Sequence, residues 1–199
     1  MKTVKQTISK ILISLGIITL SNTVNAQSND WQVAVETDPS TFIFKGYAAH
    51  LRVKPSFSNK FLIGIGTYAL DLPDFMVKMN PNNKNWNVRI QSAYALFGEY
   101  YFKNVNEKWF LGVQAGIQNY KNSHKEFSDA NLKYTNLLLM PSIGYNWKPF
   151  KNGFYIKPWA GIGYTQLISG KTTVNSTKYD LSPIVPFVTV HIGYNFKIK

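Results

Sequence analysis

Apolar and polar residues alternate along most of the chain after residue 30, with turn-forming residues between the alternating segments. In one of the clearest segments, Leu111, Val113 and Ala115 alternate with Gly112 and Gln114. A period of two residues is that of a β-strand whose two faces have different surroundings. The pattern predicts eight strands, at about residues 31–36, 42–55, 60–70, 86–103, 108–120, 132–148, 153–167 and 180–198.

The connections between these segments alternate in length. Short turns fall at about 55–59, 104–107 and 150–152, and longer loops fall at about 71–85, 122–131 and 169–178. Short turns at one rim and long loops at the other are typical of transmembrane β-barrels with an even number of strands. The sequence therefore predicts an all-β fold, an eight-stranded antiparallel up-and-down transmembrane β-barrel. A tight turn at 38–41 is the one short connection expected at the outer rim.

Three of the segments end on a glycine that is followed by an aromatic residue, at 98–102, 144–147 and 193–196. A membrane-spanning strand has this form where it reaches an interfacial girdle of aromatic side chains. We therefore expect the three ends to lie at the same rim of the barrel.

Prolines interrupt three of the expected strands. Proline cannot donate a hydrogen bond to a strand ladder. At each of them we expect either a β-bulge or a strand boundary that differs by a few residues. The three residues are Pro141, Pro158 and Pro186.

The N-terminal stretch is typical of a secretory signal. Three lysines precede an apolar segment at 11–20, and Val-Asn-Ala at 24–26 is a small-residue cleavage site. The alternative is a membrane anchor, but a spanning helix takes about 20 apolar residues. The sequence predicts a cleaved signal peptide at 1–26 and one barrel domain at 27–199.

Charge and cysteine content exclude several kinds of function. The chain has 22 Lys and Arg against 10 Asp and Glu, a formal net charge of +12. These basic residues are spread singly along the chain, so no nucleic-acid partner is expected. The absence of cysteine excludes thiolate metal sites, cysteine nucleophiles and disulfide bonds. No cofactor or metal is expected.

On its alternating segments and its final stretch, the chain resembles the small outer-membrane β-barrel family of OmpA-like, OmpX-like and opacity-type proteins. The likeness covers about residues 27–199, and the final stretch contributes Gly193, Tyr194, Phe196 and Ile198. In the family such a stretch is the signal that the barrel assembly machinery recognises. The resemblance implies a Gram-negative outer-membrane location and contact with outer-membrane lipid and lipopolysaccharide. It implies no activity, and a monomer is expected.

The alternation also places polar side chains on the inward face of the barrel. A barrel of about eight strands fills with side chains and leaves no open channel. We therefore expect a polar network of ion pairs in the lumen. Its predicted members are Glu36, His50, Arg52, Arg89, Glu99, Lys157 and His191.

Two of these residues are also the candidates for catalysis. His50 and His191 fall on the inward face, and Thr189 offers a hydroxyl nearby. A lipid-modifying hydrolase or acyltransferase is therefore an alternative function. No nucleophile elbow or oxyanion motif accompanies them, so interior hydrogen bonding is the simpler expectation.

The loop at 71–81 has the spacing of a short amphipathic helix. Leu72, Phe75, Met76 and Met79 recur at i, i+3, i+4 and i+7, and Asp71 can cap the first turn. The spacing predicts two helical turns with one apolar face. This face either packs as a lid over the barrel mouth or binds an extracellular partner.

Three functions thus remain open from the sequence. The first is a non-enzymatic outer-membrane barrel that acts through its outer loops, and the second is a lipid- or lipopolysaccharide-modifying barrel enzyme. The third is a secreted calyx that holds an apolar ligand. In a calyx the apolar face of each strand turns inward, whereas in a membrane barrel it turns outward.

Overall fold

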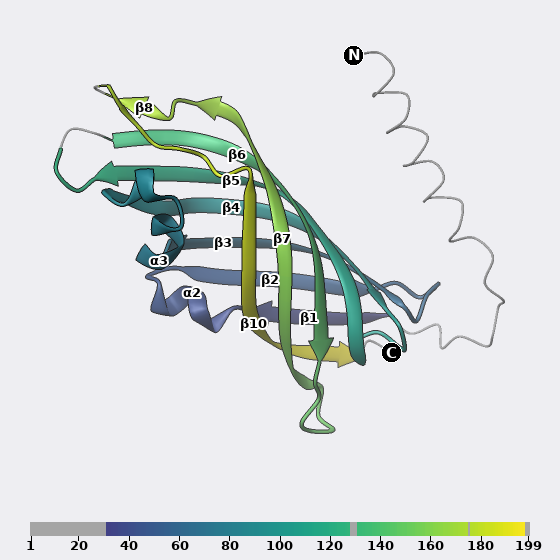
Figure 1. Ribbon diagram of the computed structural model, residues 1–199. Helices are drawn as coiled ribbons and strands as arrows, with labels where there is room; N and C mark the ends of the chain where they lie inside the picture. Colours follow the sequence, from purple (N-terminus) through teal and green to yellow (C-terminus); the bar gives the residue numbers. More distant parts are fainter. Residues whose placement is uncertain (1–30, 128–130, 175, 198–199) are drawn as a thin grey trace, which may run out of the picture.

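The computed structural model describes residues 31–127, 131–174 and 176–197, and within them eight antiparallel strands close into a barrel (Figure 1). The strands are β1 (Gln32–Thr37), β2 (Tyr47–Lys54), β3 (Phe61–Asp71), β4 (Trp86–Tyr101), β5 (Lys108–His124), β6 (Asn131–Asn146), β7 (Phe154–Gly170) and β10 (Ile184–Lys197). Each strand pairs with the next, and β10 pairs with β1 to complete the ring. The all-β, eight-stranded barrel predicted from the alternation is confirmed.

The two rims of the barrel differ as the connection lengths predict. We call the rim where β1 begins and β10 ends the terminal rim, and the opposite one the outer rim. The outer connections hold α2 (Pro39–Ile43), α3 (Asp74–Lys78), the 3-10 helix η1 (Pro81–Asn83) and the small hairpin β8 (Thr173–Val174) and β9 (Thr177–Lys178). The predicted signal peptide and Ile198 lie outside the described residues.

The two faces of the barrel wall differ in polarity. On the outward face, Ile63 and Leu96 are 55% and 65% exposed, whereas on the inward face Arg52 and Glu99 are only 1% and 6% exposed. Apolar residues therefore turn outward and charged residues turn inward. This orientation overturns the secreted calyx, which requires the reverse.

A helix replaces the tight turn expected at 38–41. The Asp38 carboxylate caps it by accepting a hydrogen bond from the Ser40 N–H over 2.9 Å, and Pro39 occupies the first helical position. Because residues 39–43 are helical, β2 begins at Tyr47 and not near residue 42. The first outer connection is therefore longer than predicted, and β1 has only six residues.

A β-bulge in β4 changes which residues face inward near the outer rim. The pairing with β5 shifts between Ile90 and Ser92. Before the bulge Val88 and Ile90 are buried, and after it Ala93 is buried. Arg89 consequently faces outward, whereas uninterrupted alternation places it inward.

The strands run through their prolines without a bulge. Across Pro141, β6 and β7 keep one register: Leu139 pairs with Tyr164 and Ser142 pairs with Gly161. The two intervening pairs are missing from the ladder, although all of these residues are described. The three prolines, Pro141, Pro158 and Pro186, lie inside β6, β7 and β10, so the expected bulges are absent. A strand boundary does differ, because β10 begins at Ile184 and not near residue 180.

The helix predicted in the second outer loop is shorter and turned differently. α3 is a single turn that begins after Pro73, because Asp71 remains at the end of β3. Val77 is the residue of α3 that is buried, while Phe75 and Met79 are exposed. The two-turn helix with its four-residue apolar face is thus corrected. No helix in the described segments is long and apolar enough to cross a bilayer.

Three layers of side chains occupy the interior of the barrel. An apolar layer near the terminal rim comprises Leu62, Tyr101, Val105 and Phe110. A second apolar layer near the outer rim comprises Leu70, Val77, Trp86, Val88, Ile90, Ala93, Tyr120, Leu132, Tyr134 and Tyr179. Charged side chains occupy the layer between them.

Candidate functional site

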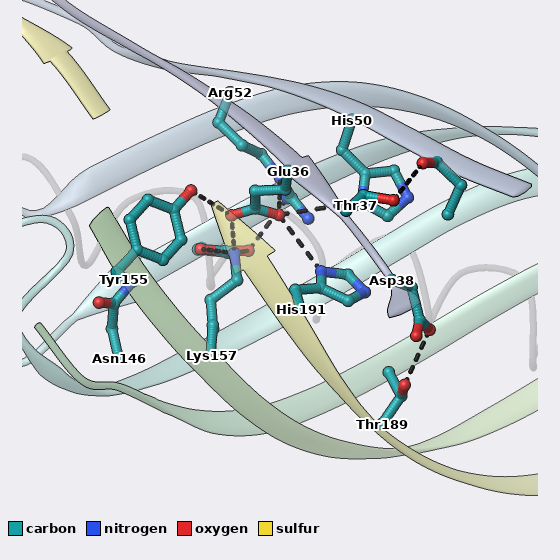
Figure 2. Close-up of polar contacts among 12 residues, drawn as sticks. Glu36, Thr37, Asp38, His50, Arg52, Asn146, Tyr155, Lys157, Thr189 and His191 are labelled. Carbon is teal, nitrogen blue, oxygen red and sulfur yellow. Dashed lines mark hydrogen bonds and ion pairs between the residues drawn. The ribbon is translucent and has the colours of Figure 1, made fainter. Parts of the chain in front are cut away.

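Six polar side chains meet in the middle layer of the barrel (Figure 2). We call them the lumen network: Glu36 of β1, His50 and Arg52 of β2, Glu99 of β4, Lys157 of β7 and His191 of β10. All six are buried, and they converge because each occupies an inward position of its strand. Alternation therefore predicts the placement of six of the seven residues proposed for the lumen.

Glu36 is the centre of the lumen network. Its Oε2 accepts a hydrogen bond from Arg52 Nε over 3.0 Å, and its Oε1 accepts one from Lys157 Nζ. Tyr155 donates its hydroxyl to Oε1 over 2.7 Å, and His191 Nδ1 lies 3.2 Å from Oε2. Both carboxylate oxygens are thus engaged by protein side chains.

The same two cations, Lys157 and Arg52, also contact the carboxylate of Glu99. Lys157 Nζ donates to Glu99 Oε1 over 3.0 Å, and Arg52 Nη1 forms an ion pair with that oxygen over 3.0 Å without hydrogen-bond geometry. Tyr101 donates its hydroxyl to Oε2 over 2.8 Å. Two carboxylates therefore balance two fixed cations, which is the condition under which buried charges are tolerated.

Tyr155 and Tyr101 are members of this arrangement that the sequence did not single out. Each lies two residues from a network residue, beside Lys157 and Glu99 respectively, and so shares its inward face. The alternation itself was the available signal, because a residue two positions from an inward residue of a strand also points inward. An aromatic side chain on a mixed polar face is more readily assigned to packing than to hydrogen bonding, although a buried hydroxyl needs a partner.

The two inward histidines lie against each other. The ring centroids of His50 and His191 are 4.7 Å apart. With Glu36 they form a set whose possible ligand atoms all lie within 4.8 Å, and these donor types suit a transition metal. The Glu36 carboxylate already bonds Arg52 and Lys157, so a metal ion would have to displace them.

The Thr189 hydroxyl, the group proposed to act with His50 and His191, forms its hydrogen bond with another residue. Thr189 donates it to Asp38 Oδ2 over 2.8 Å. A nucleophile of the triad kind is hydrogen-bonded to its histidine. Among the contacts of the described residues, no serine or threonine hydroxyl bonds to His50 or His191.

Arg89 lies apart from the lumen network, so its predicted membership is wrong. Its Nη1 lies 2.5 Å from Asp71 Oδ1 and donates to the carbonyl of Lys45 over 3.2 Å. These contacts are at the outer rim, on the outward side of β4. The bulge between Ile90 and Ser92 is the cause.

The outer loops meet over the barrel mouth and form a loop cap, comprising α3, η1 and residues 179–181. Asn83 Nδ2 donates to the Asp180 carbonyl over 2.8 Å, and the Asp180 N–H donates to Asn83 Oδ1 over 2.9 Å. Val77 and Tyr179 are buried beneath these contacts. Of the four predicted lid residues, Leu72, Met76 and Met79 line the space below the cap, and Phe75 points to the outside.

Two carboxylates of the loop cap are held ionised by their neighbours. Hydrogen bonds from Lys78 and then Lys125 lower the pKa of Asp74. Hydrogen bonds from Lys178 and then Asn82 lower the pKa of Asp180. Burial raises the pKa of Tyr179 in the same cap.

The strand ends with a glycine and an aromatic all reach the terminal rim. Phe102, Trp147 and Phe196 are exposed there. In the final stretch Gly193 is buried, while Tyr194 and Phe196 turn outward with ring centroids 4.8 Å apart. The outward aromatic edge needed for an assembly signal is therefore formed, and recognition of it stays a prediction.

No family model matches the sequence, and no curated protein matches it. Among solved structures, the N-terminal β-barrel domain of Pseudomonas aeruginosa OprF is similar at 11% identity and a TM-score of 0.44, over 85% of this chain and 99% of that one. Neisserial surface protein A (NspA) is similar at 11% identity and a TM-score of 0.37, over 87% of this chain and 100% of that one. The fold assignment rests on the closed ring of strands itself.

Proposed function

We propose that the chain is a monomeric, integral outer-membrane β-barrel protein with a structural or surface-interaction role carried by its outer loops. In this proposal the protein is non-enzymatic and has no open channel. The observation that carries it is a closed barrel whose outward face is apolar and whose charges are paired inside.

An apolar belt on the outward face supports membrane insertion. Every strand contributes an exposed apolar side chain to the belt: Val35, Leu51, Ile63, Leu96, Val113, Leu139, Ile162 and Val190. In water a contiguous surface of this size would drive association, whereas lipid covers it. Exposed aromatic side chains flank the belt at the terminal rim, as in barrels that cross an outer membrane.

The filled interior supports a role other than conduction. The lumen network closes the middle of the barrel with direct contacts of about 3 Å between Glu36, Arg52, Glu99 and Lys157. Apolar layers lie on both sides of it. An ion crossing the barrel would have to break buried ion pairs, which is costly.

A row of basic side chains supports contact with anionic lipid or lipopolysaccharide at the outer rim. Arg89 pairs with Lys121 across β4 and β5, and Lys121 pairs with Lys133 across β5 and β6. All three are on the outward face, and like charges directly opposite destabilise a sheet. Asp71 balances Arg89, so anionic groups in the membrane are left to balance the two lysines.

Exposed residues of the loop cap supply a surface for a further partner. Phe75 of α3 and Met79, which follows α3, are exposed at the outer rim. At the other rim, the stretch that ends at Phe196 is proposed to bind the barrel assembly machinery during biogenesis.

The experiment that tests the proposal combines fractionation with a gel and a bilayer measurement. We expect the protein in the detergent-extracted outer-membrane fraction, with faster gel mobility before boiling than after it. Purified protein should give no single-channel conductance in planar bilayers. A protein in the aqueous fraction without a mobility shift would overturn membrane insertion, and stable conductance would overturn the closed lumen.

A further inference from the structure

A cavity of about 160 Å³ lies between the lumen network and the loop cap. One water molecule needs roughly 10 to 15 Å³ by the same measure, so the cavity has room for a chain of several atoms. Its walls are largely apolar and include Phe97, Leu138, Met140 and Phe187. His50 and His191 form its floor.

Contacts between side chains and loops border the cavity above and below. Below it, His191 and Glu36 are 3.2 Å apart and belong to the buried ion-pair network. Above it, the paired hydrogen bonds of Asn83 and Asp180 join the second and last outer loops, with Val77 buried beneath them. Entry through the wall leaves all of these contacts intact.

The wall has such an opening where β1 ends. Thr37 is the last residue of β1 and pairs with Ile192 of β10. Residues 184–191 of β10 continue toward the outer rim and have no strand partner on that side among the described residues. Only α2 covers this edge, through the hydrogen bond from Thr189 to Asp38. We call the gap between α2 and β10 the seam.

The cavity reaches the seam from inside. Thr41 and Ala48 line the cavity on one side of the seam. Ile184 and Pro186 line the cavity on the other side. Ile184 and Pro186 are exposed and occupy outward positions of β10. A cavity bordered by outward residues extends through the barrel wall.

The main chain of β10 turns polar groups toward the seam, and Pro186 reduces their number by one N–H. The Thr165 N–H donates to the Pro183 carbonyl and the Asn195 N–H donates to the Gly153 carbonyl, so the odd residues of β10 bond to β7. Even residues therefore point their main-chain groups toward the seam. Pro186 is one of them, and it has no N–H to leave unpaired.

The seam opens at the depth of the hydrocarbon layer. The six residues of β1 span about 20 Å along the strand. With the usual tilt this is about 15 Å of height, less than the apolar band of about 25 Å in such barrels. Phe42, Ile43 and Val188, which flank the seam, are 58%, 77% and 78% exposed. The upper part of the seam therefore faces the outer leaflet.

From these observations we propose that the cavity binds one hydrocarbon chain of an outer-leaflet lipid, which enters sideways through the seam. The lipid's head group and other chains stay in the leaflet. Two buried polar atoms of cavity-lining residues, Trp159 Nε1 and Asn136 Oδ1, have no hydrogen-bond partner among the described residues. A hydroxyl group on the chain would satisfy either of them, so a hydroxylated chain should compete better than a plain one.

The test uses the full protein in phosphatidylethanolamine vesicles that contain the same lipid with a diazirine at the end of one acyl chain. After illumination, adducts are mapped by mass spectrometry. Annular lipid should label the outward residues Leu137 and Leu139, whereas a chain in the cavity should also label the inward residues Leu138 and Met140. The strand thus carries its own control.

Two variants separate the seam from the rest of the surface. Ala48→Phe fills the cavity at the seam and should reduce inward labelling to background, whereas Ala49→Phe, on the outward face of the same strand, should not. If Ala48→Phe does not fold, Ser40→Cys with Thr189→Cys replaces it. Those hydroxyl oxygens are 3.3 Å apart and the chain has no other cysteine. Oxidation should abolish inward labelling and reduction should restore it.

Each result decides the question. Labelling confined to Leu137 and Leu139 in the wild type overturns the proposal, as does inward labelling that survives the closed disulfide. Inward labelling only by a free diazirine fatty acid would assign the cavity to a soluble amphiphile and overturn lateral entry. Heat-modifiable mobility of each sample reports membrane insertion separately, so failure here is distinct from failure of the proposed function.

Discussion

The Thr189 hydroxyl donates a hydrogen bond to Asp38 Oδ2 over 2.8 Å, and this contact ties β10 to the residue that caps α2. The same carboxylate accepts hydrogen bonds from the N–H and the hydroxyl of Ser40 through Oδ1. One side chain therefore both starts the helix and holds it against the open edge of β10. Above β1, where β10 has no ladder partner on this side among the described residues, this polar contact holds α2 against the edge of β10.

Replacing Thr189 by valine should loosen that contact while keeping the side-chain volume. A hydrogen bond to a charged acceptor contributes about 2 kcal/mol, so we expect a loss of this size in the free energy of unfolding. Urea unfolding of the folded protein in detergent measures it. Thr67→Val, on β3, is the matched control and should change little. Equal losses in both variants would contradict the assigned role.

Removing Glu36 should be among the most damaging single changes in the chain. Glu36→Ala leaves Arg52 and Lys157 with an unpaired buried charge, and breaking such a pair costs about 3 to 5 kcal/mol. The same unfolding measurement applies. Glu107→Ala, in a terminal-rim turn where Glu107 contacts Asn104, should have a small effect. A mild phenotype for Glu36→Ala would show that water enters the network.

Alternation along the strands was sufficient to place the lumen network. His50 and Arg52 lie two residues apart on β2, so the assignment of one face fixes both. Alternation assigns Arg89 to the wrong face of β4. The bulge between Ile90 and Ser92 inserts one residue and so reverses the two faces beyond it. Nothing in the local sequence marks that bulge, since neither glycine nor proline occupies it.

The apolar outer half of the lumen was missed for a different reason. In the run Leu137 to Met140 both faces of β6 are apolar, which signals burial on both sides. Alternation elsewhere in the chain predicts a polar inward face, and this prediction was extended to the whole barrel. Likewise, Asp38 and Pro39 begin either a turn or a helix, and the helix that forms packs against β2, β3 and β10.

Acid should open the loop cap. Hydrogen bonds from Lys78 and Lys125 lower the pKa of Asp74, and those from Lys178 and Asn82 lower the pKa of Asp180, both from 3.8. A lowered pKa in the folded state means that the contacts are fully present above about pH 3.8. They are lost as the pH falls below that value.

Hydrogen exchange in residues 72–85 measures this opening. We expect protection to be constant from neutral pH down to about 4 and to fall below it, after correction for the intrinsic exchange rate. The variant with Asp74→Asn and Asp180→Asn should show reduced protection already at neutral pH. Protection that falls between pH 7 and 5 would point to another titrating group.

Loss of the basic row should weaken the interaction with lipopolysaccharide. Lys121→Gln with Lys133→Gln removes two cations that face each other across β5 and β6. We expect lipopolysaccharide to raise the thermal unfolding temperature of the wild type more than that of this variant, with the difference shrinking at high salt. Lys103→Gln with Lys108→Gln, near the terminal rim, is the control and should respond like the wild type. No difference between the two pairs would contradict a rim-specific contact.

Gly193 lies in the predicted assembly signal and also packs against the lumen network, and the two roles can be separated. A Cβ at Gly193 would come within 2.5 Å of the Tyr155 hydroxyl, which donates to Glu36, so Gly193→Ala must displace that ring. At Gly98 a Cβ would lie 3.6 Å from Val113, an ordinary contact. We expect Gly193→Ala to lose about 1 to 3 kcal/mol of stability after refolding in detergent, and Gly98→Ala to lose less than about 0.5 kcal/mol. Refolding in detergent requires no assembly machinery, so a loss there belongs to packing. Normal stability in detergent with reduced insertion in cells would assign Gly193 to recognition instead.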